Sequence, residues 1–497
     1  MEDSGPTIHP IDLFELGNSL LARGDAAEAV NAFRRCLAAA PDHAATSFNL
    51  GNALIKAHRP VEAVDAFVAC LRKAPDFAAA YVNLATTLRG LTLLEQAQAM
   101  AETAVRLLPA EPEAKICLAG VLHDRSQYDA AAALYRQALS SVPGHAGALS
   151  SLGNSLQAMG NLTGALAAHD RAVAAAPDDA ESRFSRATSL LAAGDFAAGW
   201  NEYEWRWQRA RSRSRGFGKP WAGEDIGGRT ILLHAEQGLG DTLQFVRYAP
   251  MVATRGGRVV LEVQPSLVRL MRTISGIGHV LARGDPLPVF DAHCPLLSLP
   301  RAFATRLETI PADIPYLNAD AAAAALWRAR LPDDGGLRVG LMWAGSPHTD
   351  DAGAHLIDRR RSLAQTELAP LGGVGGVHLV SLQKDPPKVP DEVRRGLSLI
   401  DPMADVVDFA DTAALVANLD LVISVDTSVA HLAGALGRPV WLLSRYDACW
   451  RWLDRREDSP WYPGMRIYQQ ERPLDWSGVI GRVRADLAAF VRHGTAV

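Results

Sequence analysis

Residues 14–41 read FELGNSLLARGDAAEAVNAFRRCLAAAP, and the pattern of this stretch returns in the periods that follow. An apolar residue with a small neighbour comes first, here Leu16-Gly17, and Ala29 and the bulky Phe33 come after it. The closing proline recurs with a constant step of 34 residues, at Pro41, Pro75, Pro109, Pro143 and Pro177. A constant step of this length predicts an array of stacked helix pairs, that is, a repeat solenoid.

The periods resemble tetratricopeptide repeats residue for residue, with small side chains where two helices must approach closely. Five repeats are complete. A sixth, from about Ala180, ends in four aromatic residues, which are Trp200, Tyr203, Trp205 and Trp207. Because a terminal repeat has no neighbour to cover its apolar face, we expect these aromatics to seal the array; an aromatic ligand cage is the alternative. The solenoid is expected over residues 8–208.

Length and composition fit a chain of two or three domains. The 497 residues exceed what one core usually serves, and 48% of them are hydrophobic. A formal charge of -5 gives no overall attraction to nucleic acid or membranes, so neither is expected as a partner. The segment 1–10 is acidic and polar, and no stretch approaches the apolar length of a membrane span. We therefore expect no transmembrane segment and a cytoplasmic location.

The five cysteines show no metal-ligand spacing, which argues against a zinc site and a disulfide framework. Cys36 and Cys70 occupy the same position in successive repeats, and we expect them to be packing residues.

Asparagines flank the Leu-Gly pairs on the inner helices of the repeats. They are Asn18, Asn49, Asn52, Asn83 and Asn154. Since an amide both donates and accepts, a ladder of them would hold the backbone of an extended peptide with little regard for its sequence. The alternative is that these side chains bond neighbouring turns or water. The row predicts a protein client.

After the repeats comes a basic linker, expected over residues 209–225, with arginines at Arg209, Arg211, Arg213 and Arg215. Beyond it strands alternate with helices, which predicts βαβ units and parallel sheets. Strands are expected at 230–234, 258–263, 337–343, 378–382, 397–400, 419–425 and 440–443; helices are expected from the loop at 236–241 to about Ala253 and at 321–330. We expect two Rossmann-like domains, 226–325 and 326–497, with a substrate cleft between them.

One strand-to-helix turn in the second half predicts an anion site. The strand through Val425 runs into Asp426-Thr427-Ser428, and a helix with His431 follows. The free N–H groups and positive end of that helix would bind a phosphate at the carboxyl edge of the sheet, with Thr427 and Ser428 as donors. The alternative is ordinary capping of the helix.

Its counterpart in the first half carries the candidate general base. Gly238 and Gly240 admit a close approach to the backbone, and Asp241 stands at the head of the next helix. His234 and Glu236, at the end of the preceding strand, are the alternative catalytic groups. Capping by Asp241 is the structural alternative.

These motifs, taken with others, resemble the heptosyltransferase-like glycosyltransferases with a GT-B fold, especially those fused behind tetratricopeptide repeats. The resemblance rests on the segments HAEQGLGDT (234–242), DTAA (411–414), VDTSVAHLAG (425–434), WRW (450–452) and SPWYP (459–463). It implies an acceptor domain in the first half, with Asp241 as base, and a nucleotide-sugar domain in the second.

The same resemblance supplies the donor-binding residues. It implies that Thr427, Ser428 and His431 lie on the phosphate-binding turn and that Gly345, Ser346 and Arg361 steady the leaving phosphates. Gln383 and Lys384 follow the strand at 378–382 and are candidate nucleotide contacts. Where simple heptosyltransferases tend to offer a lysine, this chain has three arginines, residues 359–361, after an insert at 347–357. The identity of the sugar therefore does not carry over.

A metal-independent glycosyltransferase is the activity expected, with the nucleotide sugar as substrate and no cofactor. A helix dipole together with arginine can stabilise the departing phosphate. The acceptor would be a hydroxyl of a protein client held by the repeats; flagellin is one client that similar fusions modify. Two alternatives stay open: a glycan or lipopolysaccharide acceptor with repeats for assembly, and a non-catalytic scaffold.

Overall fold

The computed structural model describes residues 9–209, 215–384 and 391–493. The predictions for residues 1–8 and for Arg211 and Arg213 of the linker lie outside these ranges. The chain divides into two compact units. The repeat unit contains Met1–Met159, Ala167–Ala176 and Thr349–Leu356; the α/β unit contains Gly160–Leu166, Pro177–His348 and Ile357–Val497.

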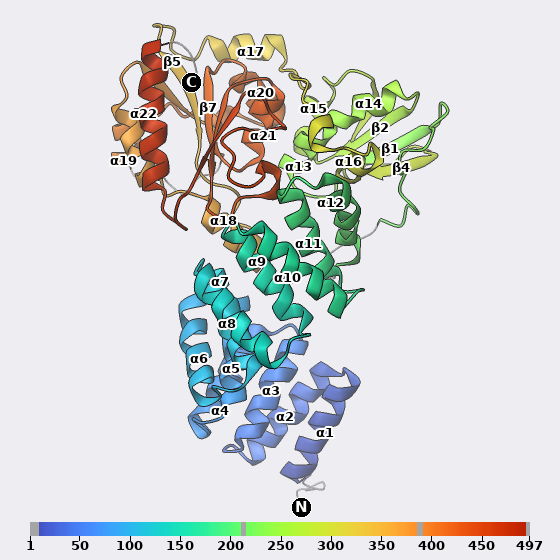
Figure 1. Ribbon diagram of the computed structural model, residues 1–497, viewed down its shortest axis with the longest axis vertical. Coiled ribbons are helices and arrows are strands. Elements are labelled where there is room, and N and C mark those ends of the chain that lie inside the picture. Colours follow the sequence, from blue (N-terminus) through green and yellow to red (C-terminus); the bar gives the residue numbers. More distant parts are fainter. Residues whose placement is uncertain (1–8, 210–214, 385–390, 494–497) are drawn as a thin grey trace, which may run out of the picture. The chain divides into compact units, whose positions relative to one another are not determined.

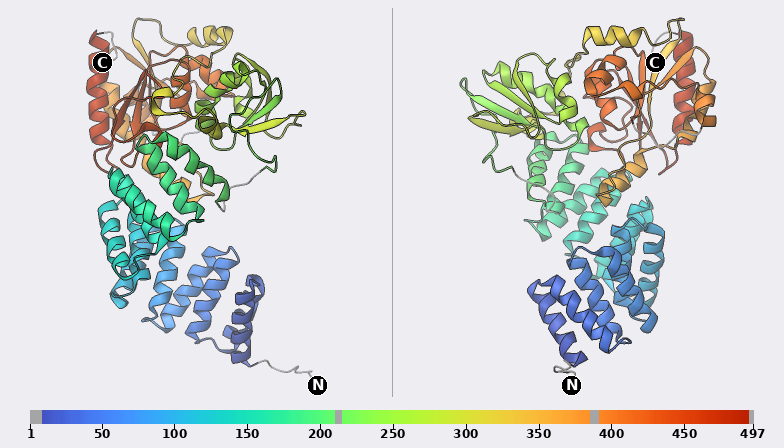
Figure 2. Two further views of the ribbon diagram at one scale, coloured as in Figure 1. Left: turned by 45° about the vertical axis from the view of Figure 1, so that its right-hand side comes forward. Right: turned by 180° about the vertical axis from the view of Figure 1, so that it is seen from behind.

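The repeat unit is built from antiparallel helix pairs (Figure 2). The pairs are α1 (Pro10–Arg23) with α2 (Ala26–Ala39), α3 (Ala44–Lys56) with α4 (Pro60–Lys73), α5 (Ala78–Gly90) with α6 (Leu94–Leu107), α7 (Pro112–Asp124) with α8 (Tyr128–Ser141), and α9 (Ala146–Ala158) with α10 (Leu162–Ala175). From α3 on, the first helix of each pair begins 34 residues after the one before it. The prolines mark the turns between pairs, and the predicted period is confirmed.

Small residues allow close helix packing within each pair. A Cβ added to Gly17 would lie 2.5 Å from Cε1 of Phe33, and one added to Gly51 would lie 2.5 Å from Cε1 of Phe67. Both rings are fully buried. Cys36 and Cys70 are buried too, which confirms their packing role.

The predicted sixth repeat lies in the α/β unit. It forms α11 (Ala180–Ala192), α12 (Phe196–Tyr203) and the 3-10 turn η1 (Glu204–Gln208). Trp200 is buried, with its ring centroid 5.4 Å from that of Trp450 and 6.0 Å from that of Phe245. Tyr203 is also buried, 5.9 Å from Trp450. These aromatics are packing residues, as predicted, and they join the last helices to the α/β core.

The first sheet is parallel, with the strand order β3-β2-β1-β4. Its strands are β1 (Thr230–His234), β2 (Arg258–Val263), β3 (Ile277–Ala282) and β4 (Ala292–Pro295). The bounds predicted for β1 and β2 are confirmed, whereas β3 and β4 were not predicted.

The helix predicted after β1 is interrupted: α13 (Leu239–Phe245), η2 (Val246–Tyr248) and α14 (Ala249–Thr254) follow one another. The other helical elements of this half are η3 (Pro265–Leu267), α15 (Val268–Met271), η4 (Leu296–Ser298), α16 (Leu299–Ala302) and η5 (Leu307–Thr309).

The second sheet is parallel as well, with the order β6-β5-β7-β8-β9. Its strands are β5 (Leu337–Met342), β6 (Val377–Ser381), β7 (Leu421–Val425), β8 (Val440–Ser444) and β9 (Met465–Gln469). The strand predicted at 397–400 is wrong. Leu397 ends a helix, and Ile400 makes only one isolated bridge, to Val380. A stretch of four residues, three of them apolar, was too short a signal to tell a helix end from a strand.

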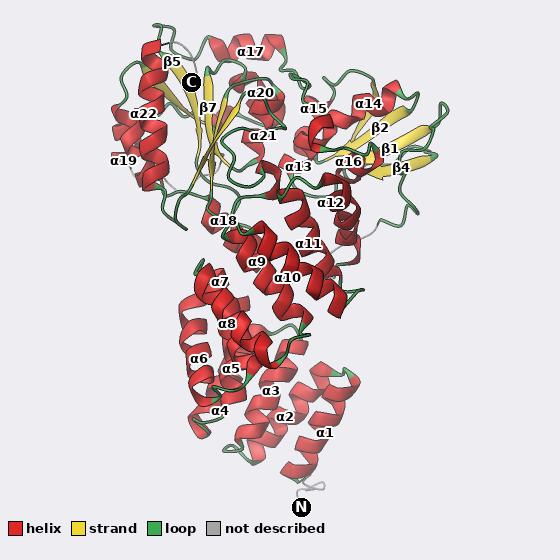
Figure 3. Cartoon of the chain, viewed as in Figure 1, coloured by secondary structure: helices red, strands yellow, loops and turns green. Residues whose placement is uncertain are grey.

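Helices cover both faces of the second sheet (Figures 1 and 3). The helical elements of this half are α17 (Ala321–Arg328), α18 (Ala352–Arg361), η6 (Gln365–Gly373), α19 (Asp391–Leu397), η7 (Met403–Asp405), α20 (Phe409–Val416), α21 (Ser428–Ala435), η8 (Trp450–Trp452) and α22 (Ser477–His493). Leucines of η6 and the apolar side of α22 pack on one face, and α20 and α21 pack on the other. This two-layer cover buries β7 and β8 along their whole length and defines a doubly wound α/β fold. In the described ranges, no helix has the length and apolar character that crossing a membrane requires.

Candidate functional site

The second sheet reverses its strand order between β5 and β7, and predicted site residues gather there. In such sheets ligands bind beyond the carboxyl ends of the strands at this switch point. Arg361, from the end of α18, donates Nη1 to the carbonyl oxygen of Asp426 at 3.1 Å and Nε to Asp358 at 2.9 Å. A Cβ added to Gly345, in the loop after β5, would collide with the Arg361 guanidinium. Arg361 therefore links the loops after β5 and β7.

The turn before α21 has the geometry of a helix start. Thr427 is the extended N-cap residue, and its buried hydroxyl lies 3.2 Å from Ser424 Oγ. Asp426 and Ser428, on either side of Thr427, are half-buried. The unpaired N–H groups of the first helical turn give this end a partial positive charge.

His431, one turn into α21, is buried. Its Nδ1 lies 3.0 Å from the Tyr462 hydroxyl, its Nε2 lies 4.0 Å from Asp426 Oδ1, and its ring stacks on Trp452. Burial lowers the pKa of His431 to about 3, although the Asp426 carboxylate opposes the shift. The side chain is therefore neutral at neutral pH and braces α21 against Trp452.

The first turn of α13 carries Gly240 and the candidate base Asp241, and it contacts the amino end of α21. A Cβ added to Gly240 would lie 2.9 Å from Cδ2 of His431 and 3.5 Å from Cα of Ser428. An added Cβ would therefore collide with the His431 ring, so the packing of this turn on α21 requires glycine at position 240. Asp241 follows directly, so the candidate base of the first half and the anion site of the second are neighbours.

Both carboxylate oxygens of Asp241 are engaged. Oδ2 accepts from the Gly238 N–H at 2.9 Å, which is the capping role foreseen as the structural alternative. Oδ1 accepts from Nη2 of Arg451, which comes from the second half. Burial lowers the pKa of Arg451 and the Asp241 carboxylate raises it; the net shift is upward, so the guanidinium stays charged.

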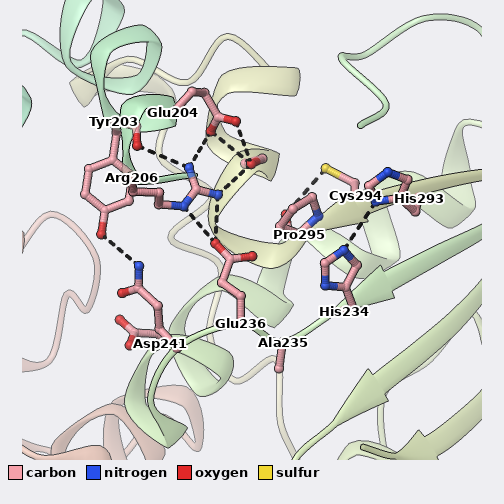
Figure 4. A network of polar contacts seen from close by, with 12 residues as sticks. Tyr203, Glu204, Arg206, His234, Ala235, Glu236, Asp241, His293, Cys294 and Pro295 are labelled. Atoms are coloured by element: carbon pink, nitrogen blue, oxygen red, sulfur yellow. Dashed lines mark hydrogen bonds and ion pairs between the residues drawn. The ribbon is translucent and has the colours of Figure 1, made fainter. Parts of the chain in front are cut away.

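The two alternative bases, Glu236 and His234, contact other residues of the first half and of η1 (Figure 4). Glu236 points toward Arg206 of η1, whose Nε and Nη2 donate to its Oε1 at 3.0 and 2.7 Å. Burial raises the pKa of Glu236 to about 7, against the pull of Arg206. His234 is buried beside His293, at 3.3 Å between ring nitrogens, and burial lowers its pKa to about 3. Of the three candidates, Asp241 alone is bonded to a residue of the second half.

Two of the remaining residues predicted to bind the nucleotide sugar, Gln383 and Lys384, form hydrogen bonds with the backbone of loops. Gln383 is buried, and its Oε1 accepts from the N–H of Ala344 after β5 at 2.9 Å. Lys384 donates to the carbonyl oxygens of Val406 and Val407 at 2.9 and 3.2 Å. Ser346 is exposed in the loop after β5.

Sequence reasoning missed two buried arginines. Arg451 was part of the 450–452 segment that carries the resemblance but was given no role, and Arg206 was not singled out. An arginine between two tryptophans in a motif was the available signal for Arg451. A separate cavity of about 510 Å³ lies between η6 and α22 and is lined by none of the predicted site residues.

The predicted peptide-binding asparagines lie on the inner helices of the repeat unit. Nδ2 of Asn49 donates to Oδ1 of Asn18 at 2.7 Å, and Nδ2 of Asn83 donates to Oδ1 of Asn52 at 2.7 Å. All four are half-buried. Asn154, in α9, is half-buried as well, and the two repeats before it place Thr86 and Cys117 at the pairing positions, 3.6 Å apart.

Family models match both parts of the chain. Two models of the tetratricopeptide repeat match residues 14–78, 82–146 and 122–192. The model of glycosyltransferase family 9 (heptosyltransferase) matches residues 399–444, the stretch from the end of α19 through α20, β7 and α21 to β8. The matches thus agree with the resemblance, which predicted tetratricopeptide repeats followed by a heptosyltransferase-like part.

One curated relative is Protein FlbA of Caulobacter vibrioides, 29% identical over 324 residues. The match covers 59% of this chain and 52% of FlbA, so the chain spans about half the length of this relative.

Similar solved structures include YrrB, described as a tetratricopeptide-repeat protein with an unusual peptide-binding site, and TTC0263, a thermophilic tetratricopeptide-repeat protein from Thermus thermophilus. YrrB is 23% identical, with coverage of 35% of this chain and 89% of YrrB and a TM-score of 0.31. TTC0263 is 25% identical, with coverage of 37% and 99% and a TM-score of 0.32. Scores this low support no argument about function.

Proposed function

We propose that this chain is a GT-B glycosyltransferase that moves a sugar from a nucleotide-activated donor to a hydroxyl group of a protein client held by the repeats. The observation that carries the proposal is the contact of Gly240, in the first turn of α13, with the start of α21. It makes Asp241 a neighbour of a helix end suited to phosphate. The match of this helix and its strand to the glycosyltransferase family 9 model supports the same assignment.

The chemistry needs a base beside an anion site. The acceptor oxygen bonds to the anomeric carbon of the sugar, the bond from that carbon to the phosphate oxygen breaks, and the nucleotide leaves with the electron pair. The acceptor proton goes to Asp241. The N–H groups at the start of α21 and the Arg361 guanidinium would stabilise the leaving phosphate, so the proposed step routes no charge through a metal ion.

A protein client is supported by the paired amides of the inner repeat helices. Each Asn–Asn pair uses one N–H and one oxygen, which leaves donors and acceptors for a peptide backbone. Tethering a client also raises the local concentration of its hydroxyl groups. A flagellin-type protein is one client class within this proposal.

The test is intact-mass analysis of cellular proteins with the wild-type chain, without it, and with Asp241→Ala. We expect a protein whose added mass equals a sugar residue in wild-type cells only. Purified chain should also release nucleotide from a nucleotide sugar when the client is present. If no nucleotide sugar binds and no client gains mass, the chain is a scaffold and the proposal is wrong.

A further inference from the structure

Arg451 is a buried guanidinium with every nitrogen engaged. Nη2 donates to Asp241, Nε donates to Gln244 Oε1 at 2.9 Å, and Nη1 lies 3.3 Å from Cys449 Sγ. Its side chain is 11% exposed, and its guanidinium carbon lies 4.3 Å from the centroid of the Trp450 ring. The arginine belongs to the second half and Asp241 to the first, so the bond joins the two halves at the candidate base.

This bond conflicts with a base role for Asp241. Oδ2 accepts from the Gly238 N–H and Oδ1 accepts from Arg451, so the lone pairs left for an acceptor hydroxyl belong to a carboxylate that already shares its charge with a cation. Gly238 caps the same helical turn and is held by the backbone. Arg451 is the partner on a separate element, so it is the partner that can leave.

Arg451 is followed by a residue that packs on α21, the helix of the proposed phosphate site. The next residue, Trp452, stacks on His431 of α21 with ring centroids 5.3 Å apart. Gly240, in the first turn of α13, contacts Ser428 at the start of that helix. A guanidinium binds phosphate oxygens with two parallel hydrogen bonds, and a nucleotide phosphate offers more negative charge than one carboxylate.

Bracing of the two halves does not explain the bond by itself. Arg269 already forms ion pairs across the halves, with Asp408 and Asp411 at 3.1 Å each. Next to Arg451, the fully buried Nε2 of Gln244 has no hydrogen-bond partner in the described residues, so this pocket of polar groups is not fully paired as it stands.

We propose that Arg451 is shared by two anions: it bonds Asp241 in the structure and passes to the phosphate of the nucleotide donor when the donor binds at α21. The exchange takes the cation away from Asp241, so the carboxylate is a stronger proton acceptor once the donor is bound. Arg451 is then a phosphate ligand and a positioning residue for Asp241. This inference rests on the proposed function.

The test is calorimetric titration of the full chain with UDP, GDP, ADP, CDP and CMP, and with the matching nucleosides. For the nucleotide that wild type binds, Arg451→Met should weaken affinity about tenfold or more and leave nucleoside affinity unchanged, because only a phosphate contact is lost. Arg451→Lys should restore part of the loss. Asp241→Asn should tighten nucleotide binding, because Arg451 no longer has a charged competitor. Arg269→Met, which breaks the other inter-half pairs, is the matched control and should bind as wild type does.

The outcomes separate the two proposals. If wild type binds a nucleotide and neither Arg451→Met nor Asp241→Asn alters its affinity, Arg451 is a brace and the exchange is wrong, while the proposed function stands. If wild type binds none of the nucleotides, both fall. Should Arg451→Met fail to fold, the Asp241→Asn titration decides alone.

Discussion

Arg206 donates two hydrogen bonds to a single oxygen of Glu236, from Nε at 3.0 Å and from Nη2 at 2.7 Å (Figure 4). The two side chains are 4% and 6% exposed. Arg206 also donates to Glu204 Oε1 at 2.6 Å and to Ser298 Oγ at 2.7 Å. The end of the degenerate sixth repeat is therefore joined to the carboxyl edge of the first sheet by a buried ionic network.

Removing the cation of this network should be costly. Arg206→Met leaves the carboxylates of Glu236 and Glu204 without their cation in a buried site, and breaking such a pair costs about 3–5 kcal/mol of unfolding free energy. The measurement is guanidinium chloride unfolding followed by circular dichroism. Arg456→Met, which breaks an exposed pair with Asp458, is the control and should change stability by less than about 1 kcal/mol. Equal effects of the two variants would contradict this account.

The repeat packing gives a steric prediction. A Cβ at Gly51 would lie 2.5 Å from the buried Phe67 ring, so Gly51→Ala forces the helix pair apart and should destabilise the chain by about 1–3 kcal/mol. Gly90, the last residue of α5, has nothing within 4 Å of an added Cβ. Gly90→Ala is therefore the matched control and should be neutral or stabilising by up to about 1 kcal/mol. Thermal unfolding of both variants checks the contrast.

The repeat array was the most predictable part of the fold, because each period repeats the same contact. Leu16-Gly17 with Phe33 and Pro41 predicts one helix pair, and its recurrence fixes the step to the next pair. β3 and β4 were missed for the opposite reason: β3 is mostly exposed or half-buried, and β4 has four residues, so neither shows a clear alternation.

The site was predictable only as far as local rules reach. That Asp241 and Ser428 stand at strand-to-helix turns follows from the sequence, since both follow apolar strands. Tertiary packing brings Arg451 to Asp241, which is 210 residues away in the sequence. It also brings Arg206 to Glu236, whose carboxylate is then bonded away from the proposed site. No local pattern carries that information.

Two buried histidines predict a stability loss in acid. Burial lowers the pKa of His431 and of His234 to about 3, from 6.5. Because the folded pKa is the lower one, the stability is fully present above pH 6.5 and is lost as pH falls toward 3. Between pH 7.5 and 5 each histidine should cost about 2 kcal/mol of unfolding free energy.

Urea unfolding at a series of pH values measures this slope. His431→Gln should reduce the slope of unfolding free energy against pH by the contribution of one histidine, since glutamine cannot titrate. His279, at an exposed position of β3, is the control, and His279→Gln should keep the wild-type slope. A His431→Gln slope equal to the wild-type slope would show that the His431 ring does not resist protonation.

The paired asparagines give a prediction that separates client binding from catalysis. Asn49→Ala with Asn83→Ala removes two inter-repeat amide pairs and the donors they leave for a peptide backbone. Losing a few backbone hydrogen bonds should lower kcat/KM for a protein client about tenfold or more, while transfer to a small hydroxyl acceptor stays at the wild-type rate. Thr86→Val is the matched control, because it breaks the equivalent contact with Cys117 without removing an amide. The same loss with both acceptors, or with Thr86→Val, would mean that the amides serve repeat packing alone and that the client is held elsewhere.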